Sequence, residues 1–389
     1  MNNRPTYHGG VISNPLTLAR VLGIELADLL AMSVDTVSHY KAKEINKKTV
    51  GAGKRVIHMP DESIKRLLRR VNSRIFNGVT FPGYLYGSIS DQENPRDYIK
   101  CAELHCRASV LIKVDISNFF SQITTEHVYK IFLKFFNFSH EVSEILSKIT
   151  TVTGFVPQGA PTSTFIANLC FFETEASLVT YLHGAGFRYS RLIDDITVST
   201  LNNKLPWQYV EDRIVRFLDK EGFSINADKT ESISTPSAQS FKVHGLCIGD
   251  EKPRFSKKHI DEIKKSVNCV LKKALFSDKN RKEKSYHKLF YSTQGKTTKL
   301  KRVKHNSYPS LKKALGRYAL PLPDERESYR LNIAVKNLER DYPTLSSKLA
   351  YRNRYYKAKF RVGILSRIYR RDATLLNNRL KDILPTYED

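Results

Sequence analysis

The feature that most restricts the fold of this chain is the placement of acidic residues at the ends of mostly apolar segments. Asp115 follows residues 111–114, which read as a buried strand. Asp194 and Asp195 stand at the tip of an expected hairpin over residues 188–199. Carboxylates in an apolar setting are unfavourable unless they bind something positive. Magnesium is a natural partner, because it prefers carboxylate and phosphate oxygens.

Two acidic sites of this kind suit phosphoryl or nucleotidyl transfer assisted by two metal ions. Two adjacent aspartates are by themselves more often part of an ordinary turn than of a metal site. The choice between the two therefore depends on the neighbouring sequence. That sequence contains the segments Pro157-Gln158-Gly159-Ala160-Pro161-Thr162-Ser163, Asn226-Ala227-Asp228-Lys229-Thr230 and Val243-His244-Gly245-Leu246-Cys247.

In this order and spacing, the motifs resemble the palm of reverse transcriptases. The 157–163 run is a signature of retron-type and group II intron-like enzymes, and residues 55–60 resemble the family's early Arg-x-Ile-x-x-Pro motif. Residues 16–24 resemble the start of retron enzymes. Two retron motifs, Asn-Ala-x-x-His and Val-Thr-Gly, are present in altered form at 101–105 and 243–245. One departure stands at Leu192, where the family usually has tyrosine before the aspartate pair.

The resemblance implies a catalytic role for each carboxylate. Asp115 and Asp194 would bind two Mg²⁺ ions, with the backbone carbonyl of Ile116 as a further ligand. Asp195 would be the supporting third carboxylate of the metal site. Lys229 would approach the pyrophosphate leaving group and act as a general acid; a plain surface lysine is the alternative.

The same resemblance implies the substrate contacts. Arg55 would bind the triphosphate, and Gln158 with Gly159 would contact the incoming nucleotide. Phe120 would be a steric gate that rejects a ribose 2′-OH, unless it is a plain core residue. The turn formed by Gly245, Leu246 and Cys247 would grip the primer strand.

The positive charge of the chain is concentrated in its last third. The formal net charge is +25, and residues 251–389 hold 36 Lys and Arg against 14 Asp and Glu. Such a basic segment is expected to bind nucleic acid, with cations on the phosphates and interleaved rings on the bases. The interleaving is clearest in Tyr351-Arg352-Asn353-Arg354-Tyr355-Tyr356-Lys357.

These patterns predict an α+β fold with a right-hand polymerase architecture. Residues 1–100 would form N-terminal helices and fingers, 101–250 the catalytic palm with interleaved fingers, and 251–389 a basic α-helical thumb and RNA-binding extension. Residues 14–32 are expected to form a helix that packs on the fingers, with a helix-turn-helix DNA reader as the alternative. The Ser/Thr/Lys-rich stretch 292–310 is expected to be a loop, either an RNA-contacting insertion or a mobile linker.

Cys101, His105 and Cys106 look like a ligand cluster in the sequence. No second pair of such residues has zinc-finger spacing, so a zinc site is not predicted.

The predicted function is RNA-directed DNA synthesis on an associated noncoding RNA, in bacterial anti-phage defence. The expected partners are this RNA, the RNA–DNA duplex, dNTPs and an effector encoded nearby. Two alternatives stay open: a non-retron defence enzyme that makes repetitive or protein-primed DNA, and a catalytically silent RNA-binding scaffold. Few cysteines, no long apolar run and no apolar leader predict a cytoplasmic protein without membrane contact.

Overall fold

The computed structural model describes residues 3–46, 54–91, 94–234 and 241–387. This described chain divides into two compact units, of which the first ends at Arg254 and the second begins at Phe255. None of its described helices combines the length and the apolar character that a membrane span requires.

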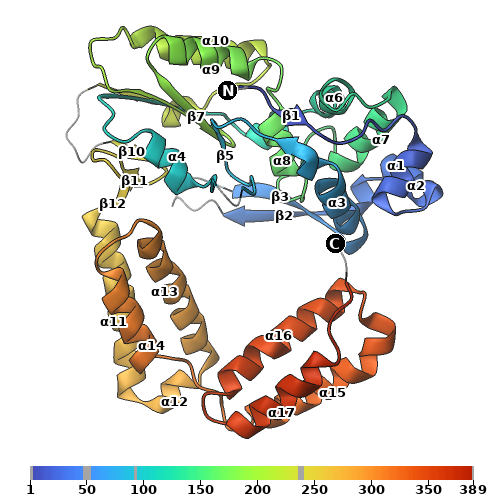
Figure 1. The fold of residues 1–389 in the computed structure, drawn as a ribbon, viewed down its shortest axis with the longest axis vertical. Coiled ribbons are helices and arrows are strands. Elements are labelled where there is room, and N and C mark those ends of the chain that lie inside the picture. Colours follow the sequence, from blue (N-terminus) through green and yellow to red (C-terminus); the bar gives the residue numbers. More distant parts are fainter. Residues whose placement is uncertain (1–2, 47–53, 92–93, 235–240, 388–389) are drawn as a thin grey trace. The chain divides into compact units, whose positions relative to one another are not determined.

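The first unit is built on a mostly antiparallel sheet (Figure 1). Within the described residues its strand order is β5-β7-β8-β6-β9, and β5 runs parallel to β7. The strands are β5 Leu85–Tyr86, β6 Val110–Asp115, β7 Arg188–Leu192, β8 Asp195–Thr200 and β9 Glu231–Ile233. The strand expected before Asp115 and the hairpin expected at 188–199 are both confirmed.

The two faces of this sheet differ because side chains alternate along each strand. One face is apolar and packs in a single hydrophobic cluster with helices α8 (Ser163–Leu169), α9 (Glu175–Gly184) and α10 (Gln208–Lys220). The β6 and β8 members of this cluster are Val110, Ile112, Val114, Ile196 and Val198. The opposite face carries Asp115 and Asp195, which stand directly opposite each other in the β6–β8 register. The alternation therefore places the carboxylates on the side away from this cluster.

Helices surround the sheet and extend the hydrophobic cluster toward the N-terminus (Figure 1). They are α1 Pro15–Leu22, α2 Leu26–Val34, α3 Glu62–Arg74, α4 Tyr98–Leu104, α5 Phe119–Gln122, α6 Thr125–Lys130, α7 His140–Thr150, α8 Ser163–Leu169, α9 Glu175–Gly184 and α10 Gln208–Lys220, with the 3-10 helices η1 Val37–His39, η2 Phe76–Gly78 and η4 Ala227–Lys229 and the π-helix η3 Ile131–Phe135. The side chain of Asn14 caps α1, and Gly23 ends it in the left-handed conformation. Residues 14–32 consequently form two helices rather than one.

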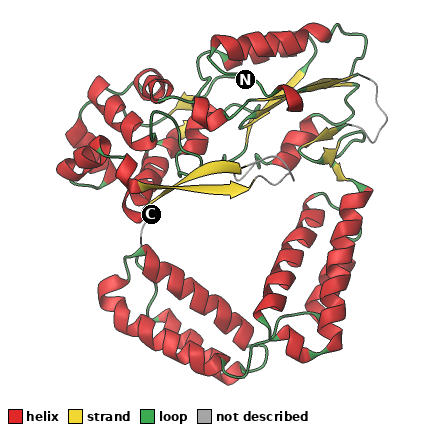
Figure 2. Ribbon diagram, turned by 180° about the vertical axis from the view of Figure 1, so that it is seen from behind, coloured by secondary structure: helices red, strands yellow, loops and turns green. Residues whose placement is uncertain are grey.

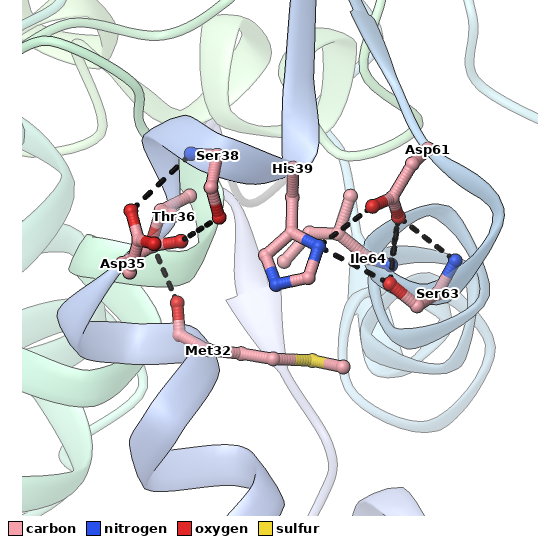
Figure 3. A network of polar contacts seen from close by, with 8 residues as sticks. All are labelled: Met32, Asp35, Thr36, Ser38, His39, Asp61, Ser63 and Ile64. Atoms are coloured by element: carbon pink, nitrogen blue, oxygen red, sulfur yellow. Dashed lines mark hydrogen bonds and ion pairs between the residues drawn. The ribbon is translucent and has the colours of Figure 1, made fainter.

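A long hairpin of β2 Tyr40–Asn46 and β3 Lys54–Pro60 projects from the helices, in register from Tyr40 opposite Pro60 to Asn46 opposite Lys54. Its base is fixed to the start of α3 by the polar contacts in Figure 3. Asp61 caps α3 by accepting from the backbone of Ser63 and Ile64, and its other oxygen lies 2.7 Å from His39 Nδ1. The Ser63 hydroxyl contacts the same ring nitrogen of His39. A histidine that activates a serine nucleophile contacts the hydroxyl and the carboxylate through different ring nitrogens, so Asp61, His39 and Ser63 form a structural cap instead.

Short strands complete the first unit. Strand β1 Thr6–Tyr7 pairs with β4 Val79–Thr80, and β10 Lys242–Val243, β11 Leu246–Cys247 and β12 Arg254–Phe255 form a small sheet in that order. Strand β12 lies where the two units divide. The strand pair expected at 241–248 is thus confirmed.

The second unit is helical beyond β12 (Figure 2). One hydrophobic cluster includes Val267, Phe290 and Leu315; a second includes Leu331, Val335, Tyr351 and Leu376. The helices are α11 Lys257–Phe276, α12 Asp278–Arg281, α13 Lys284–Arg302, α14 Tyr308–Tyr318, α15 Glu327–Leu345, α16 Leu349–Leu365 and α17 Arg370–Lys381. Together with the sheet of the first unit, these helices confirm the α+β fold class.

The loop expected at 292–310 is wrong, because α13 continues to Arg302. Thr293, Thr297 and Leu300 recur at helical spacing and are buried, so the stretch has an inward face despite its polar composition. The hydroxyl of Thr297 also donates to the carbonyl of Thr293, which satisfies that polar group inside the helix.

The expectation that Tyr351 and Tyr355 offer rings to nucleic-acid bases is also wrong. Both are 1% exposed in the cluster of α15–α17. Their hydroxyls donate to the carbonyls of Ile383 and Leu380. The ring of Tyr356, by contrast, remains open to a partner, at 51% exposure.

Candidate active site

Backbone pairing brings the acidic residues together. Asp115 ends β6 and Asp195 begins β8, and the two are cross-strand partners. The amide of Ile116 donates to the carbonyl of Asp194 at 3.0 Å, which ties the hairpin tip to the end of β6. The amide of Asn226 donates to the carbonyl of Asp115 at 2.7 Å and fixes the other side. The carboxylates predicted at separate strand ends therefore belong to one site.

Crowding of these carboxylates shifts their pKa values. Burial raises the pKa of Asp194 to about 6, and repulsion from Asp195 adds to this effect. Burial also raises the pKa of Asp115, against the opposing attraction of Lys229. Burial would raise the pKa of Asp195 too, but His244, Asp115 and Lys229 together outweigh it and lower this pKa. The site thus concentrates negative charge that a cation would stabilise.

Lys229 supplies one such cation. It ends the 3-10 helix η4, and its ammonium donates to both oxygens of Asp115 at 3.0 and 3.1 Å. These hydrogen bonds raise the pKa of Lys229, so it stays protonated at neutral pH. Its side chain is 63% exposed and reaches the site from the solvent.

The residues present fit a hard divalent cation in their chemistry. Among the described residues, no group of at least three Asp, Glu, His or Cys side chains is arranged to hold a metal ion as it stands. Asp115, however, already binds a positive charge through both oxygens, and Asp194 and Ile116 line the same cavity. Oxygen ligands of this kind suit Mg²⁺.

That cavity has a volume of about 850 Å³ and is lined by two of the four residues predicted to contact the nucleotide. Phe120 and Gln158 line it together with Asp115, Asp194 and Lys229. The Phe120 ring is half-buried beside Phe119, with the ring centroids 6.0 Å apart. Phe119 lines the same cavity but is only 2% exposed, so the less buried Phe120 is the ring that is more accessible to a ligand there.

The loop of Gln158 and Gly159 contacts the β2–β3 hairpin. The amide of His58 on β3 donates to the carbonyl of Gln158 at 3.2 Å. Gly159 has a φ of +119°, which favours glycine, and a Cβ there would lie 3.4 Å from the His58 carbonyl. Arg55 belongs to β3 by its backbone, and its side chain lies outside the described residues.

The predicted primer grip lies beside a second cavity of about 490 Å³. Gly245 lines it, together with Asp115, Asp195, Lys242 and His244. Leu246 is fully buried and Cys247 is half-buried, so these two residues support the turn rather than face the cavity. Asp115 consequently borders both cavities, whereas Asp194 borders the first and Asp195 the second.

His244 is a site residue to which the sequence assigns no role. Its Nδ1 lies 3.6 Å from Asp195 Oδ2, and its Nε2 lies 3.3 Å from Cys101 Sγ. The first distance indicates an electrostatic contact rather than a close hydrogen bond. In the sequence, His244 is marked only by its place in the altered Val-Thr-Gly motif. That motif does not indicate a contact with Cys101, which lies 143 positions earlier in the chain.

The residues of the Cys101, His105 and Cys106 cluster are held by other protein groups. His105 is fully buried, with Nδ1 2.8 Å from Ser199 Oγ and Nε2 2.7 Å from Ser190 Oγ. Cys101 contacts the same Ser190 hydroxyl, and Cys106 Sγ contacts a carbonyl one helical turn back. His105 therefore links the end of α4 to both strands of the β7–β8 hairpin, as a neutral ring between two hydroxyls.

This burial predicts an acid-sensitive fold. Burial lowers the pKa of His105 from 6.5 to about 3, so between these values the unfolded chain binds a proton that the folded chain does not. Stability from this group is complete above pH 6.5 and is lost as the pH falls toward 3. Between pH 7 and pH 5 the free energy of unfolding should fall less in His105→Gln than in the unaltered protein, by about 1 to 2 kcal/mol. Urea denaturation at both pH values measures it.

The exposed His183 of α9 gives the matched control. His183→Gln should leave the pH dependence as it is in the unaltered protein. An unchanged pH dependence in His105→Gln would show that the ring is not held neutral.

Comparison with known proteins decides the family. Residues 45–270 match the family described as reverse transcriptase (RNA-dependent DNA polymerase). The retron Ec48 reverse transcriptase of Escherichia coli is 34% identical over 360 residues, which cover 90% of this chain and 87% of that protein. The chain belongs to the retron-type reverse transcriptases.

A second relative of this reverse transcriptase is the retron Se72 enzyme of Salmonella heidelberg. It is 30% identical over 343 residues, covering 86% of this chain and 87% of the relative. Among solved structures, the apo telomerase of Candida tropicalis aligns over 89% of this chain and 68% of that chain, with 14% identity and a TM-score of 0.41. At that TM-score the likeness supports no further inference.

Membership confirms the enzyme class predicted from the motifs. The reverse transcriptase is an RNA-directed DNA polymerase, and its family depends on divalent metal ions. An RNA template is accordingly its partner. The roles of individual residues stay predictions.

Proposed function

We propose that this reverse transcriptase uses two Mg²⁺ ions to copy an associated noncoding RNA into DNA in bacterial anti-phage defence. Asp115 and Asp194 would bind both ions, with Ile116 as a carbonyl ligand and Asp195 in support. The observation that supports this site is the meeting of the carboxylates and Lys229 where two cavities adjoin. The defence role rests on the resemblance to retron enzymes.

The chain's own residues divide the work of nucleotide addition. Bound magnesium would activate the attacking hydroxyl and stabilise charge on the transferred phosphoryl group. Gln158 and Gly159 would hold the incoming dNTP, with Arg55 on its triphosphate, and Phe120 would exclude a ribose 2′-OH. The Gly245–Cys247 turn would hold the primer beside the second cavity.

Lys229 would serve the leaving group. Its raised pKa keeps the ammonium charged at neutral pH, as a proton donor to pyrophosphate must be. Its exposed stem allows the ammonium to exchange Asp115 for a phosphate oxygen when a nucleotide enters the cavity. Both actions neutralise negative charge that leaves with the pyrophosphate.

Leu192 is the observation that would favour a catalytically silent scaffold. It pairs with Tyr86 of β5 and lies directly before Ile193 and the aspartates. The substitution removes a phenol but leaves the carboxylate cluster assembled. Altered primer positioning, rather than loss of activity, is therefore the expected consequence of Leu192.

Sequencing the nucleic acid that copurifies with the full chain tests the proposed function. A branched RNA–DNA molecule joined through a 2′-OH is expected for a retron, and loss of phage resistance should follow when its gene is deleted. Simple-repeat DNA without a branch would support the alternative defence enzyme. RNA without any DNA, together with no dNTP incorporation, would support the scaffold.

We also propose that residues 1–100, 101–250 and 251–389 act as fingers, palm and thumb. The basic second unit would then carry most of the RNA affinity. Affinity of the full chain for its RNA is expected to fall by about 1000-fold or more between 50 and 200 mM salt, if about six phosphates are neutralised. Deleting residues 251–389 should remove this salt-dependent binding in a filter-binding titration.

The control is the fold of the shortened protein, measured by circular dichroism. Tight, salt-sensitive RNA binding by folded residues 1–250 would contradict the assigned division of labour.

A further inference from the structure

The tip of the catalytic hairpin contains an unfavourable backbone conformation. Ile193, directly before Asp194, has a φ of +61°. A β-branched residue in the left-handed region is a true outlier that costs about 1 to 3 kcal/mol. Such a turn persists only when surrounding contacts hold it.

Arg191 provides these contacts from the apolar face of the sheet. It is 0% exposed, and each of its donor hydrogens has an acceptor. Nε and Nη2 bind the two oxygens of Glu175 at 2.6 and 2.8 Å. Nη1 donates to the carbonyls of Ile193 at 3.1 Å and Ala167 at 3.0 Å, and Nη2 donates to that of Asn168 at 3.1 Å.

Glu175 is fixed as firmly as its partner. It begins α9 and is 2% exposed, and it accepts a further hydrogen bond from the Tyr189 hydroxyl at 2.7 Å. A buried ion pair of this kind contributes little net stability, since apolar replacements are often neutral or stabilising. The Arg191–Glu175 pair therefore matters more for the conformation of the hairpin than for the stability of the fold.

The other acceptors of Arg191 connect the hairpin to the nucleotide cavity. Ala167 and Asn168 stand in the last turn of α8, whose carbonyls have no partner within the helix. This helix follows the Gln158–Gly159 loop directly in sequence. One guanidinium thus ties together the strained turn, α9 and the helix that follows the nucleotide-contacting loop.

We propose that Arg191, held by Glu175, is a positioning residue that maintains the Ile193 turn and so directs Asp194 toward the metal site. The inference rests on the proposed role of Asp194 as a metal ligand. Loosening of the turn would displace the Asp194 carboxylate, whereas the Gln158–Gly159 loop keeps its separate backbone hydrogen bond from His58 on β3 and so its contacts with the dNTP. The defect should then appear in metal binding and turnover, not in nucleotide affinity.

Arg191→Lys tests this in the full chain. The variant keeps the positive charge, but one ammonium cannot span both Glu175 and the Ile193 carbonyl. On a synthetic RNA template with a DNA primer, kcat is expected to fall about 10- to 100-fold while KM for dNTP changes less than about twofold. Mn²⁺ affinity without nucleotide, measured by electron paramagnetic resonance, should fall several-fold.

Arg361→Lys is the control for loss of a two-point ion pair, because Arg361 binds both oxygens of Glu327 in the second unit, although this pair is less buried. It should change stability without changing kcat or Mn²⁺ affinity. If Arg191→Lys does not fold, the double variant Arg191→Met/Glu175→Gln, which removes both buried charges, gives the same readouts.

The outcomes separate the inference from the proposed function. A folded Arg191 variant with normal kcat and Mn²⁺ affinity, alongside an inactive Asp194→Asn, overturns the positioning role only. An active Asp194→Asn overturns the metal site itself. Loss of kcat and Mn²⁺ affinity in folded Arg191→Lys, with normal behaviour of Arg361→Lys, supports the inference.

Discussion

Replacing Asp194 and Asp195 together by asparagine is expected to abolish DNA synthesis, with a loss of about 1000-fold or more. Asparagine keeps the shape of each side chain but removes the charge that would hold the metal ions, which supply several kcal/mol of transition-state stabilisation. The measurement is incorporation of labelled dNTP on an RNA template with a DNA primer. If the double variant polymerised normally, the assignment of the site would be wrong.

The stability of the metal-free protein should rise in Asp194→Asn, although activity is lost. The raised pKa of Asp194, at about 6, means that its charge is unfavourable in the metal-free fold at pH 7. Asp194→Asn should therefore raise the unfolding free energy of the metal-free protein by about 1 to 2 kcal/mol. Loss of activity with gained stability excludes misfolding as the cause.

Asp228→Asn is the matched control for charge. Asp228 lines both cavities but is exposed and lies outside the proposed metal ligands. Its removal should lower activity less than about tenfold, because no transition-state contact is assigned to it. A loss as large as that of the Asp194/Asp195 variant would extend the metal site to Asp228.

Phe120→Ala is expected to relax the choice of sugar. The ring lines the nucleotide cavity with Asp115 and Gln158, where the gate role places it against the 2′ position. Its removal would create room for a ribose hydroxyl, so the preference for dNTP over rNTP, as a ratio of kcat/KM values, should fall by about 100-fold. Single-nucleotide incorporation with dGTP and GTP opposite a template cytosine measures this ratio.

Phe155→Ala provides the comparison, since Phe155 lines the same cavity and packs edge-on against His58 at 5.6 Å. It should leave the sugar preference within a few-fold of the original value. Unchanged sugar preference in an active Phe120→Ala would assign Phe120 to the core.

The sequence predicted those parts of the site that depend on local pattern. Apolar alternation ending in an aspartate was enough to place β6 and the β7–β8 hairpin, because strand side chains follow a period of two. The same period places Arg191 on the apolar face with Tyr189. A charged residue there signals a buried partner, but Glu175 belongs to another element and no local pattern identifies it.

Contacts between segments that are distant in the chain could not be predicted from the sequence. Lys229 meets Asp115 across 114 positions, and His244 meets Cys101 across 143, so neither pair follows from spacing. The error at 292–310 has a different cause, since threonines that bond back to their own helix can face inward although their composition suggests a loop. Tyr351 and Tyr355 were misjudged because a tyrosine satisfied through its hydroxyl can serve as core.

The separate hydrophobic clusters of the two units have a thermodynamic consequence. A chain with several cores need not unfold in one cooperative step, and a single melting temperature then describes no definite transition. The clusters around Val267 and around Leu331 can lose structure while the sheet that carries Asp115 persists. Under the proposed division of labour, RNA binding and catalytic geometry would therefore be lost at different temperatures.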